Sequence, residues 1–377
     1  MKKPPIIPLN IAVFAITTLV AGIAMPLWVY FEGIDIVEIC TAIALFFFTG
    51  MSITAGYHRL WSHKTYEAHW LVKVVLAIGG AMTVQNSILH WASDHRVHHR
   101  RVDINDKDPY SAKRGFWFSH IGWMLREHPA ERHENYANCK DLQKDKVVMW
   151  QHKHYLAIVL CANFGITGML GFINGDIIGM ILIAGVARLV IVHHITFFIN
   201  SLAHIWGRRP YTNANTARDN GIIALFTFGE GYHNYHHIFE YDYRNGIHWW
   251  QYDPTKWLIR VLAMVGLTKN LRRTPEERIE KAKLQMQLQH AKSKLVNLPN
   301  TEEIVLKMQK EYDLLVQKMA EYYAVRKKLL SHKTGELKAS YEKFELDFAY
   351  KELKQSFILQ KQKWQQVYAF YMAPVSS

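Results

Sequence analysis

Four apolar runs arranged in two pairs constrain the fold of this chain more than any other feature. They lie at about residues 11–30, 37–57, 155–173 and 177–199. Each run holds about 20 residues, which is enough for an α-helix to cross a hydrocarbon core about 30 Å thick. The sequence therefore predicts an all-α protein, an integral membrane bundle of four transmembrane helices.

The charges around these runs predict how the helices are oriented. The linkers at residues 31–35 and 174–176 lack Lys and Arg, whereas the segments after the second and fourth runs are rich in both. Because cytoplasmic loops of membrane proteins carry an excess of Lys and Arg, we expect both termini and the long middle segment in the cytoplasm. A cleavable signal peptide is not expected, since the first run lacks a small-residue cleavage site. The net charge of +13 fits a face beside anionic lipid, and no nucleic-acid-binding motif accompanies it.

Two further segments complete the predicted organisation. Residues 70–90 are apolar and are expected to lie along the membrane surface, because a crossing here would separate the histidines on either side of it. Near residue 268 the composition turns polar, so we expect a membrane domain at 1–267 and a cytoplasmic helical extension at 268–377. A heptad stripe in the extension fits either a helical hairpin packed on itself or a coiled coil used for self-association or partner docking. The stripe comprises Met308, Leu315, Tyr322 and Leu329.

Nine of the 21 histidines fall in four tight groups, each just beyond an apolar run or the amphipathic segment. They are His58, His63, His95, His98, His99, His204, His233, His236 and His237. The pattern HxxHH occurs twice, and on a helix it places three imidazoles on one face. His58 and His63 are five residues apart, a spacing that we expect at a turn where the second span ends. Independent histidines have no reason to repeat this pattern, so we expect a cytoplasmic histidine-rich cap that binds metal.

The ligand type narrows the choice of metal. Neutral imidazole binds iron, zinc, copper and nickel. Zinc has no redox chemistry and usually takes four ligands, whereas nine nitrogens exceed the needs of one ion. The three cysteines form no CxxC pair and indicate no disulfide framework. The histidines therefore favour two redox-active iron ions.

At these residues the chain resembles a known family. The segments HRLWSH (58–63), WASDHRVHH (91–99), NSLAH (200–204) and GEGYHNYHH (229–237) are similar to the motifs of membrane acyl-CoA desaturases of the stearoyl-CoA Δ9 type. The similarity runs from about residue 40 to 265 and includes GFWFSHIGW at 115–123. The histidines alone would also admit membrane hydroxylases and alkane monooxygenases, and it is the flanking residues that favour desaturases.

The resemblance implies a role for each matching position. The nine histidines would bind two Fe2+ ions, and Asn200 would hold one of them through a water molecule. The bend of an acyl tunnel would be lined by Gln85, Trp91 and Thr196. Coenzyme A would be contacted by Asn86, Asp94, Lys113 and Arg114. The family pattern is incomplete at Phe197, where animal relatives have Trp, and at Ser93, where the family has Arg.

The activity that the resemblance implies is O2-dependent desaturation of a saturated acyl-CoA to a cis-monounsaturated acyl-CoA, at the Δ9 position. Two electrons would come from an external donor of the ferredoxin or cytochrome b5 type with its reductase, because the sequence has no flavin or nicotinamide fingerprint and no fused HPGG motif. The alternatives are a fatty acid hydroxylase or a phospholipid-acyl desaturase of the same histidine class. A metal transporter is disfavoured, since the histidines all lie on one predicted side. The short N-terminus favours a bacterial inner membrane over the endoplasmic reticulum.

Overall fold

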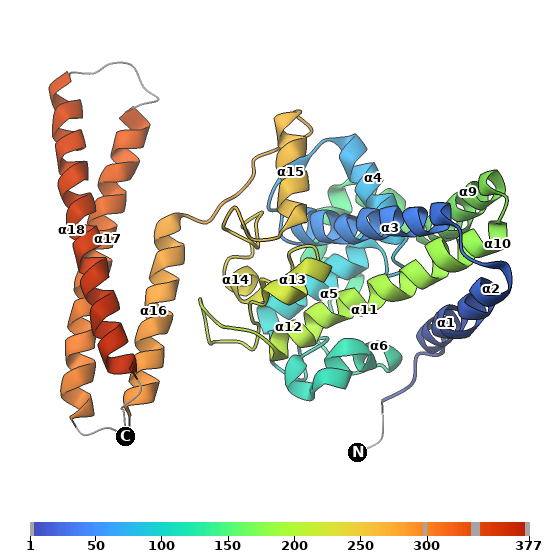
Figure 1. Cartoon of the computed structure of the whole chain (residues 1–377), viewed down its shortest axis with the longest axis horizontal. Coiled ribbons are helices and arrows are strands. Elements are labelled where there is room, and N and C mark those ends of the chain that lie inside the picture. Colours follow the sequence, from blue (N-terminus) through green and yellow to red (C-terminus); the bar gives the residue numbers. More distant parts are fainter. Residues whose placement is uncertain (1–3, 297–299, 333–339, 374–377) are drawn as a thin grey trace. The chain divides into compact units, whose positions relative to one another are not determined.

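The computed structural model describes residues 4–296, 300–332 and 340–373, and these form two compact units. The first unit holds the chain up to Arg209 together with Ala214–Arg273. The second holds Pro210–Asn213 and the chain from Thr274 onward. Helices make up almost all of the regular structure (Figure 1), so the prediction of an all-α protein is confirmed.

Four helices of the first unit are long and apolar enough to cross a membrane. They are Pro8–Glu32, Ile36–Ser62, Tyr155–Asn174 and Ile177–Ile205. The second and fourth helices continue past the predicted ends at residues 57 and 199. As a result, His58 and His204 lie within these helices rather than in the loops beyond them.

Each of these helices contains a stretch of π-helix between or beside α-helical segments. The first is built from α1 (Pro8–Leu19), η1 (Val20–Ala24) and α2 (Met25–Glu32). The second is α3 (Ile36–Met51) followed by η2 (Ser52–Ser62). The third is α8 (Tyr155–Leu160), η7 (Cys161–Ile166) and α9 (Thr167–Asn174). The fourth is α10 (Ile177–Met180), η8 (Ile181–Ala187), α11 (Arg188–Asn200) and α12 (Leu202–Ile205).

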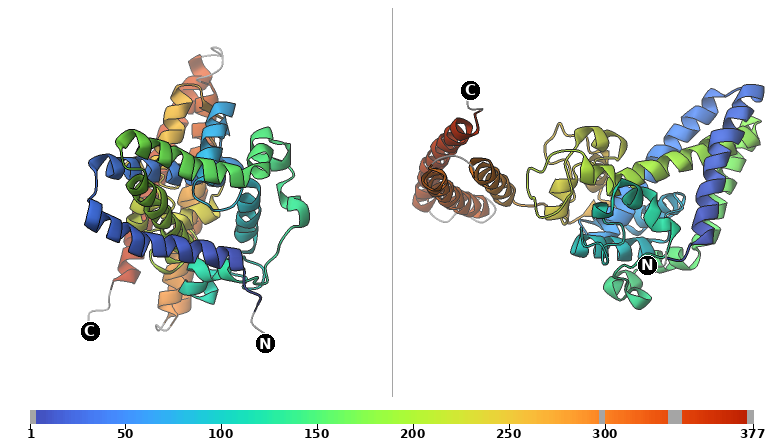
Figure 2. Two further views of the ribbon diagram at one scale, coloured as in Figure 1. Left: turned by 90° about the vertical axis from the view of Figure 1, so that its right-hand side faces the viewer. Right: turned by 90° about the horizontal axis from the view of Figure 1, so that it is seen from below.

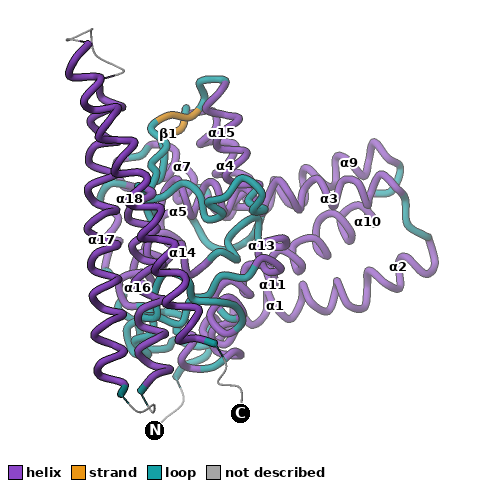
Figure 3. Tube along the Cα trace, turned by 60° about the vertical axis from the view of Figure 1, so that its left-hand side comes forward, coloured by secondary structure: helices purple, strands orange, loops and turns teal. Residues whose placement is uncertain are grey.

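The two hairpin turns of the bundle lie together at one end of the first unit. Asp35 begins α3 with a capping box completed by Glu38, and the side chain of Asp176 caps α10. Trp28 Nε1 donates to Asp176 Oδ2 at 3.2 Å, and Asn174 Nδ2 donates to Asp35 Oδ2 at 3.1 Å. The elements that carry the histidines lie at the opposite end of the bundle (Figures 1 and 3). Both hairpins therefore return the chain to the same end, as the sequence predicted.

The second long helix ends in eleven residues of π-helix, η2, all of them buried. Its last hydrogen bond runs from the backbone N–H of His63 to the carbonyl of His58 at 3.1 Å. The expectation of a turn between these two histidines was wrong. A bond from residue i to residue i−5 brings residues five apart onto neighbouring turns, and such π-helical segments are frequent at functional sites.

Short helices and loops form a cap around the histidine end of the bundle. The helices of the cap are α4 (Trp70–Ala81), α5 (Ile88–Arg101), η3 (Ala112–Arg114), η4 (Phe118–Gly122), α6 (Trp123–Leu125), η5 (Glu134–Cys139), η6 (Leu142–Lys144), α7 (Lys146–Lys153), α13 (Gly221–Phe226), α14 (His233–Ile238) and α15 (Pro254–Met264). The apolar stretch expected over residues 70–90 ends as a helix at Ala81, which is too short to cross a membrane. Its outer face exposes Trp70, Leu71 and Val75, while Val72 and Leu76 are buried. Apolar side chains thus lie on both its exposed and its buried face, and its amphipathic character and its place at the membrane surface stay predictions.

A small antiparallel sheet ties the end of the first unit to its middle. The strands β1 (Glu67–Ala68) and β2 (Thr268–Lys269) pair with Glu67 opposite Lys269. Arg272 N also donates to the carbonyl of Thr65 at 2.9 Å. These bonds hold the chain in the first unit as far as Arg273, past the predicted boundary at residue 267.

The second unit contains three long helices around a core of its own (Figure 2). They are α16 (Glu276–Leu295), α17 (Thr301–His332) and α18 (Ser340–Met372). Met308, Leu315 and Tyr322 of the heptad stripe are buried in this core with residues such as Leu288 and Trp364, and Leu329 is also buried. The stripe is thus covered by α16 and α18 of the same chain. Pro299, Thr334 and Gly335, whose residue types or pairing often interrupt helices, lie outside the described residues.

Candidate metal centre

The nine predicted ligands come together in two groups. The first group, called here the five-histidine group, consists of His58, His63, His95, His99 and His236. The second, the four-histidine group, consists of His98, His204, His233 and His237. Within each group the potential ligand nitrogens lie within 4.8 Å of one another. The histidines come from η2 and the residue that follows it, and from α5, α12 and α14, so segments far apart in the sequence converge at one place.

The inner nitrogens of both groups face one another at distances that suit metal binding. In the five-histidine group, His58 Nε2 lies 2.9 Å from His236 Nε2, and His63 Nε2 lies 2.8 Å from His95 Nε2. In the four-histidine group, His233 Nε2 lies 3.1 Å from the Nε2 atoms of His204 and His237. Two nitrogens that each bind one ion at about 2.1 Å and at right angles are about 3 Å apart. The donor set and its spacing therefore fit two transition-metal ions with imidazole ligands.

The protonation of these imidazoles also suits metal binding. Burial and the neighbouring imidazoles hold the pKa of His63, His95 and His236 well below the ordinary value, and the same causes act on His233 and His237. Burial likewise lowers the pKa of His99, to about 4, although Glu240 opposes the shift. At neutral pH these rings are uncharged, so each offers a nitrogen lone pair.

Carboxylates lie behind the five-histidine group. His58 Nδ1 lies 2.9 Å from Glu230 Oε2, and His99 Nδ1 lies 3.1 Å from Glu240 Oε2. On its other side Glu230 Oε1 accepts two bonds from the Arg59 guanidinium, at 2.9 and 3.1 Å. Burial raises the pKa of Glu230, but His58 and Arg59 outweigh it and bring the pKa to about 2. An ionised carboxylate thus faces the outer nitrogen of a candidate ligand, which orients the ring and increases its basicity.

Two glycines make room for Glu230 in this arrangement. Gly229 has a φ of +100°, and a Cβ there would lie 2.6 Å from Asp253 Oδ1. A Cβ on Gly231 would lie 2.2 Å from the backbone nitrogen of Ala224. On either side of the buried Glu230, the backbone at Gly229 and Gly231 therefore passes too close to the segments around Asp253 and Ala224 to leave room for a side chain.

The four-histidine group is supported by a loop that follows α5. His98 Nδ1 lies 2.9 Å from Asp108 Oδ1, and His204 Nδ1 lies 2.8 Å from Thr216 Oγ1. Burial raises the pKa of Asp108, yet His98 and the backbone N–H groups of Asp103 and Tyr110 lower it overall. His233 Nδ1 is buried and has no hydrogen-bond partner among the described residues.

These supporting residues were missed by the sequence reasoning, with one partial exception. Glu230 was noticed only as part of the GEGYHNYHH motif, and its position next to two glycines is the signal that could have identified it. Glu240, Asp108 and Thr216 lie in irregular segments without periodicity. The sequence carries no spacing rule that links them to particular histidines.

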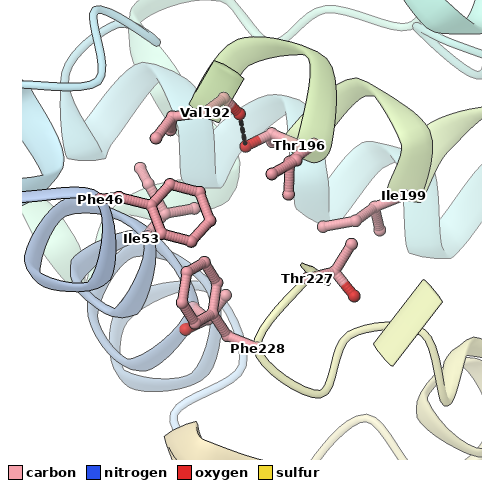
Figure 4. A pocket seen from close by; sticks show the side chains of 10 residues that line it. Phe46, Ile53, Val192, Thr196, Ile199, Thr227 and Phe228 are labelled. Atoms are coloured by element: carbon pink, nitrogen blue, oxygen red, sulfur yellow. Dashed lines mark hydrogen bonds between the residues drawn. The ribbon is translucent and has the colours of Figure 1, made fainter. Parts of the chain in front are cut away.

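The three residues expected around an acyl tunnel lie near the histidines or near an apolar pocket. Gln85 Nε2 donates to Thr196 Oγ1 at 3.1 Å, and the Trp91 ring stacks on His95 with 4.7 Å between centroids. Thr196 also lines a narrow, mostly apolar pocket between the second and fourth long helices (Figure 4). Its other walls include Phe46, Ile53, Val192, Ile199 and Phe228.

The residues expected to contact coenzyme A, and Asn200, have the following surroundings. Asn86 has a left-handed backbone with φ of 71°, and Asp94 Oδ2 lies 3.4 Å from His90 Nε2. The Arg114 guanidinium lies 3.6 Å from the centre of the Phe118 ring, while Lys113 is exposed. Asn200 ends α11, one turn before His204, and is half-buried. The roles given to these residues stay predictions.

Comparison with known proteins decides the family. The family model described as "Fatty acid desaturase" matches residues 37–269, which include all nine histidines. The chain belongs to the fatty acid desaturase family. It is 46% identical over 246 residues to a probable acyl-CoA desaturase of Schizosaccharomyces pombe, and 45% identical over 239 residues to acyl-CoA desaturase 1 of Saccharomyces cerevisiae. It is 37% identical over 242 residues to stearoyl-CoA desaturase 5 of Bos taurus.

The coverage of these alignments differs between the relatives. The aligned regions take in 65%, 63% and 63% of this chain and 51%, 46% and 72% of the three relatives, in the same order. The chain thus spans about half the length of the two yeast relatives. The matched region of the family model ends at residue 269, so of the second unit it takes in only Pro210–Asn213. These relatives come from yeasts and a mammal, which does not favour the bacterial membrane that the sequence suggested.

Proposed function

We propose that the chain is an acyl-CoA desaturase, which inserts a cis double bond into a saturated acyl-CoA at the Δ9 position with the use of O2. The observation that carries the proposal is the convergence of nine imidazoles in two groups at the end of an apolar helical bundle. The similarity to proteins named acyl-CoA desaturases supports the choice of reaction and substrate.

Each histidine group would hold one Fe2+ ion, and Asn200 would hold one of the two through water. Bound iron would supply the redox chemistry with O2 that unactivated methylene groups require, since C–H bonds offer no handle for acid–base catalysis. Glu230, Glu240 and Asp108 would keep the outer nitrogens of His58, His99 and His98 protonated, so that the inner nitrogens stay available.

The residues around the pocket would hold the acyl chain and exclude water. Apolar side chains such as Phe46 and Phe228 offer no competing hydrogen bonds, and the bonded pair Gln85–Thr196 would mark the bend. Trp91, which stacks on His95, would place the chain beside the metal ligands. Holding the reacting methylenes at a fixed place selects the bond to be oxidised. Asn86, Asp94, Lys113 and Arg114 would contact coenzyme A.

The electrons would come from a separate carrier of the ferredoxin or cytochrome b5 type with its reductase. A basic cytoplasmic face would attract an acidic carrier. We place the histidine cap and both termini in the cytoplasm, because the hairpin turns at the other end of the bundle lack Lys and Arg.

The direct test uses membranes that contain the full chain, stearoyl-CoA or palmitoyl-CoA, O2 and a reducing system. Gas chromatography of the fatty esters should show the Δ9 cis monoene, and its amount should depend on O2 and iron. Membranes with the His98→Ala variant serve as the control. Hydroxylated products, or desaturation only of phospholipid-bound chains, would replace the proposal with one of its alternatives. Unchanged substrate under all conditions would contradict it.

A further inference from the structure

Thr216 stands between a metal-site histidine and a buried carboxylate. Its Oγ1 lies 2.8 Å from His204 Nδ1 and 2.7 Å from Asp103 Oδ1. Its backbone N–H donates to the other oxygen of Asp103, Oδ2, at 2.7 Å. His204 and Asp103 are buried. Thr216 thus contacts His204 through its hydroxyl, and it is bonded to Asp103 through both its hydroxyl and its backbone N–H.

The hydrogen-bond chemistry of these contacts fixes the proton on His204. A threonine hydroxyl has one hydrogen to donate, and here Asp103 Oδ1 is its acceptor at 2.7 Å. The hydrogen of Thr216 Oγ1 therefore goes to Asp103, and the hydroxyl must accept the bond from His204 Nδ1. His204 then carries its proton on Nδ1, and its Nε2 presents a lone pair toward His233 Nε2, 3.1 Å away.

Asp103 is itself held by the neighbouring loop. It adopts a left-handed backbone conformation with φ of 67°, which costs energy for a residue with a Cβ. Its N–H donates to Asp108 Oδ2 at 3.0 Å, while Asp108 Oδ1 faces His98 Nδ1 at 2.9 Å. The same loop therefore orients two members of the four-histidine group, one directly and one through Thr216.

The five-histidine group is supported by other residues. Glu230 Oε2, which faces His58, also accepts from Asn245 Nδ2 at 2.6 Å. Arg59 links Glu230 to Asp253, whose Oδ2 it approaches at 3.1 Å. Tyr110 connects the two supports, because its hydroxyl lies 3.1 Å from His95 Nδ1 and its N–H donates to Asp108. Among the described contacts, Thr216 reaches this connection through Asp103, whose N–H donates to Asp108.

We propose that Asp103 and Thr216 are positioning residues that fix the tautomer and orientation of His204, so that the metal position of the four-histidine group is supported separately from that of the five-histidine group. The inference rests on the proposed metal centre. Loss of an outer hydrogen-bond partner of a metal-bound histidine typically lowers metal affinity about 10- to 100-fold. Loss of the Thr216 hydroxyl should therefore weaken one of two metal-binding steps and leave the other unchanged.

The experiment measures metal binding by the purified full chain. The metal-free protein is titrated with Co2+, and bound metal per chain is determined by mass spectrometry together with the two dissociation constants. Thr216→Val, which keeps the shape and removes the hydroxyl, should weaken one step about 10- to 100-fold. Thr216→Ser should restore it. Thr17→Val, whose lost bond lies within the first long helix, should bind as the wild type does.

Further variants show which histidine group is responsible for the affected binding step. His204→Ala should lack the same step, and Thr216→Val added to it should cause no further loss. Asn245→Ala should weaken the other step. If Thr216→Val reduces the yield of folded protein, Asp103→Asn, which keeps the residue's size but removes one acceptor, should show a smaller loss in the same step.

Wild-type binding by Thr216→Val, or equal weakening of both steps, would overturn the inference. So would failure of Thr216→Ser to restore the affected step. Because the readout is metal binding, a protein that binds two metals but does not desaturate acyl-CoA would contradict the proposed function and leave this test intact.

Discussion

The two histidine groups share two helices as sources of ligands, α5 and α14, yet they are supported from behind in different ways. Behind the five-histidine group, Glu230 and Arg59 form a buried ion pair that is continued by Asp253. Behind the four-histidine group, a loop supplies Asp108 directly and Asp103 through the hydroxyl of Thr216. In the first support a buried guanidinium pairs with the carboxylate, whereas in the second the carboxylates are held by backbone N–H groups and a hydroxyl. The two metal positions should therefore respond differently to mutation and to acid.

The largest effect is expected when a ligand itself is removed. His98→Ala should abolish desaturation and lower bound iron by about one ion per chain, because the four-histidine group would keep three imidazoles. Membrane insertion should be unchanged, since the four long helices are untouched. Iron analysis, an activity assay and membrane fractionation measure the three quantities. Full turnover by this variant would mean that the ligand assignment is wrong.

A smaller but still large effect is expected at the buried ion pair. Glu230→Gln should destabilise the chain by about 3–5 kcal/mol and weaken the metal of the five-histidine group, because the Arg59 charge would lose one of its buried partners. The matched control is Glu240→Gln, since Glu240 also faces the group but is 31% exposed, where screening reduces the effect. Denaturant unfolding and metal titration compare the two variants. Equal effects at both positions would contradict the role of burial.

Low pH should reduce the stability that Glu230 contributes to the folded chain. The pKa of Glu230 in the folded protein is about 2, below its ordinary value of 4.5, so folding stabilises the ionised carboxylate. Its contribution to stability is present above about pH 4.5 and is lost as the pH falls toward 2. In the metal-free protein, Glu230→Gln should flatten the dependence of unfolding on pH in this window. An unchanged slope would show that Glu230 is not the group that titrates.

The smallest effect on the site is expected from the second unit. Trp364→Ala should destabilise the three-helix core by about 3–5 kcal/mol, because a fully buried ring is removed. Bound metal and desaturation should stay at wild-type values, since the candidate site lies within the first unit. Limited proteolysis reports the loosened core. Loss of metal in this variant would show that the two units depend on each other.

The sequence predicted what depends on composition and periodicity. Four apolar runs predicted the long helices, and four groups of histidines, two of them with the pattern HxxHH, predicted the nine side chains that the structure brings into two groups. It did not predict the π-helix that joins His58 and His63, because bonds from residue i to residue i−5 leave no periodic signal in hydrophobicity. The partners of the outer nitrogens were also missed. Asp108 and Thr216 reach their histidines through loop geometry that only tertiary contacts define.

The second unit shows the limit of a repeat pattern on its own. The stripe of Met308, Leu315, Tyr322 and Leu329 fitted either an internal core or a surface for association. In the structure all four residues are buried, and Met308, Leu315 and Tyr322 share one core with residues of α16 and α18. A heptad repeat reports that a helix face is covered, and the partner that covers it depends on which other helices the chain provides.

If the nine histidines form two separate metal positions, the purified, iron-replete full chain should hold two irons. Iron analysis and the Mössbauer spectrum of this protein should show two irons per chain in nitrogen-rich environments, with one lost in His204→Ala and the other lost in His58→Ala. A single iron per chain in the active wild-type protein, or loss of both irons from either variant alone, would contradict it.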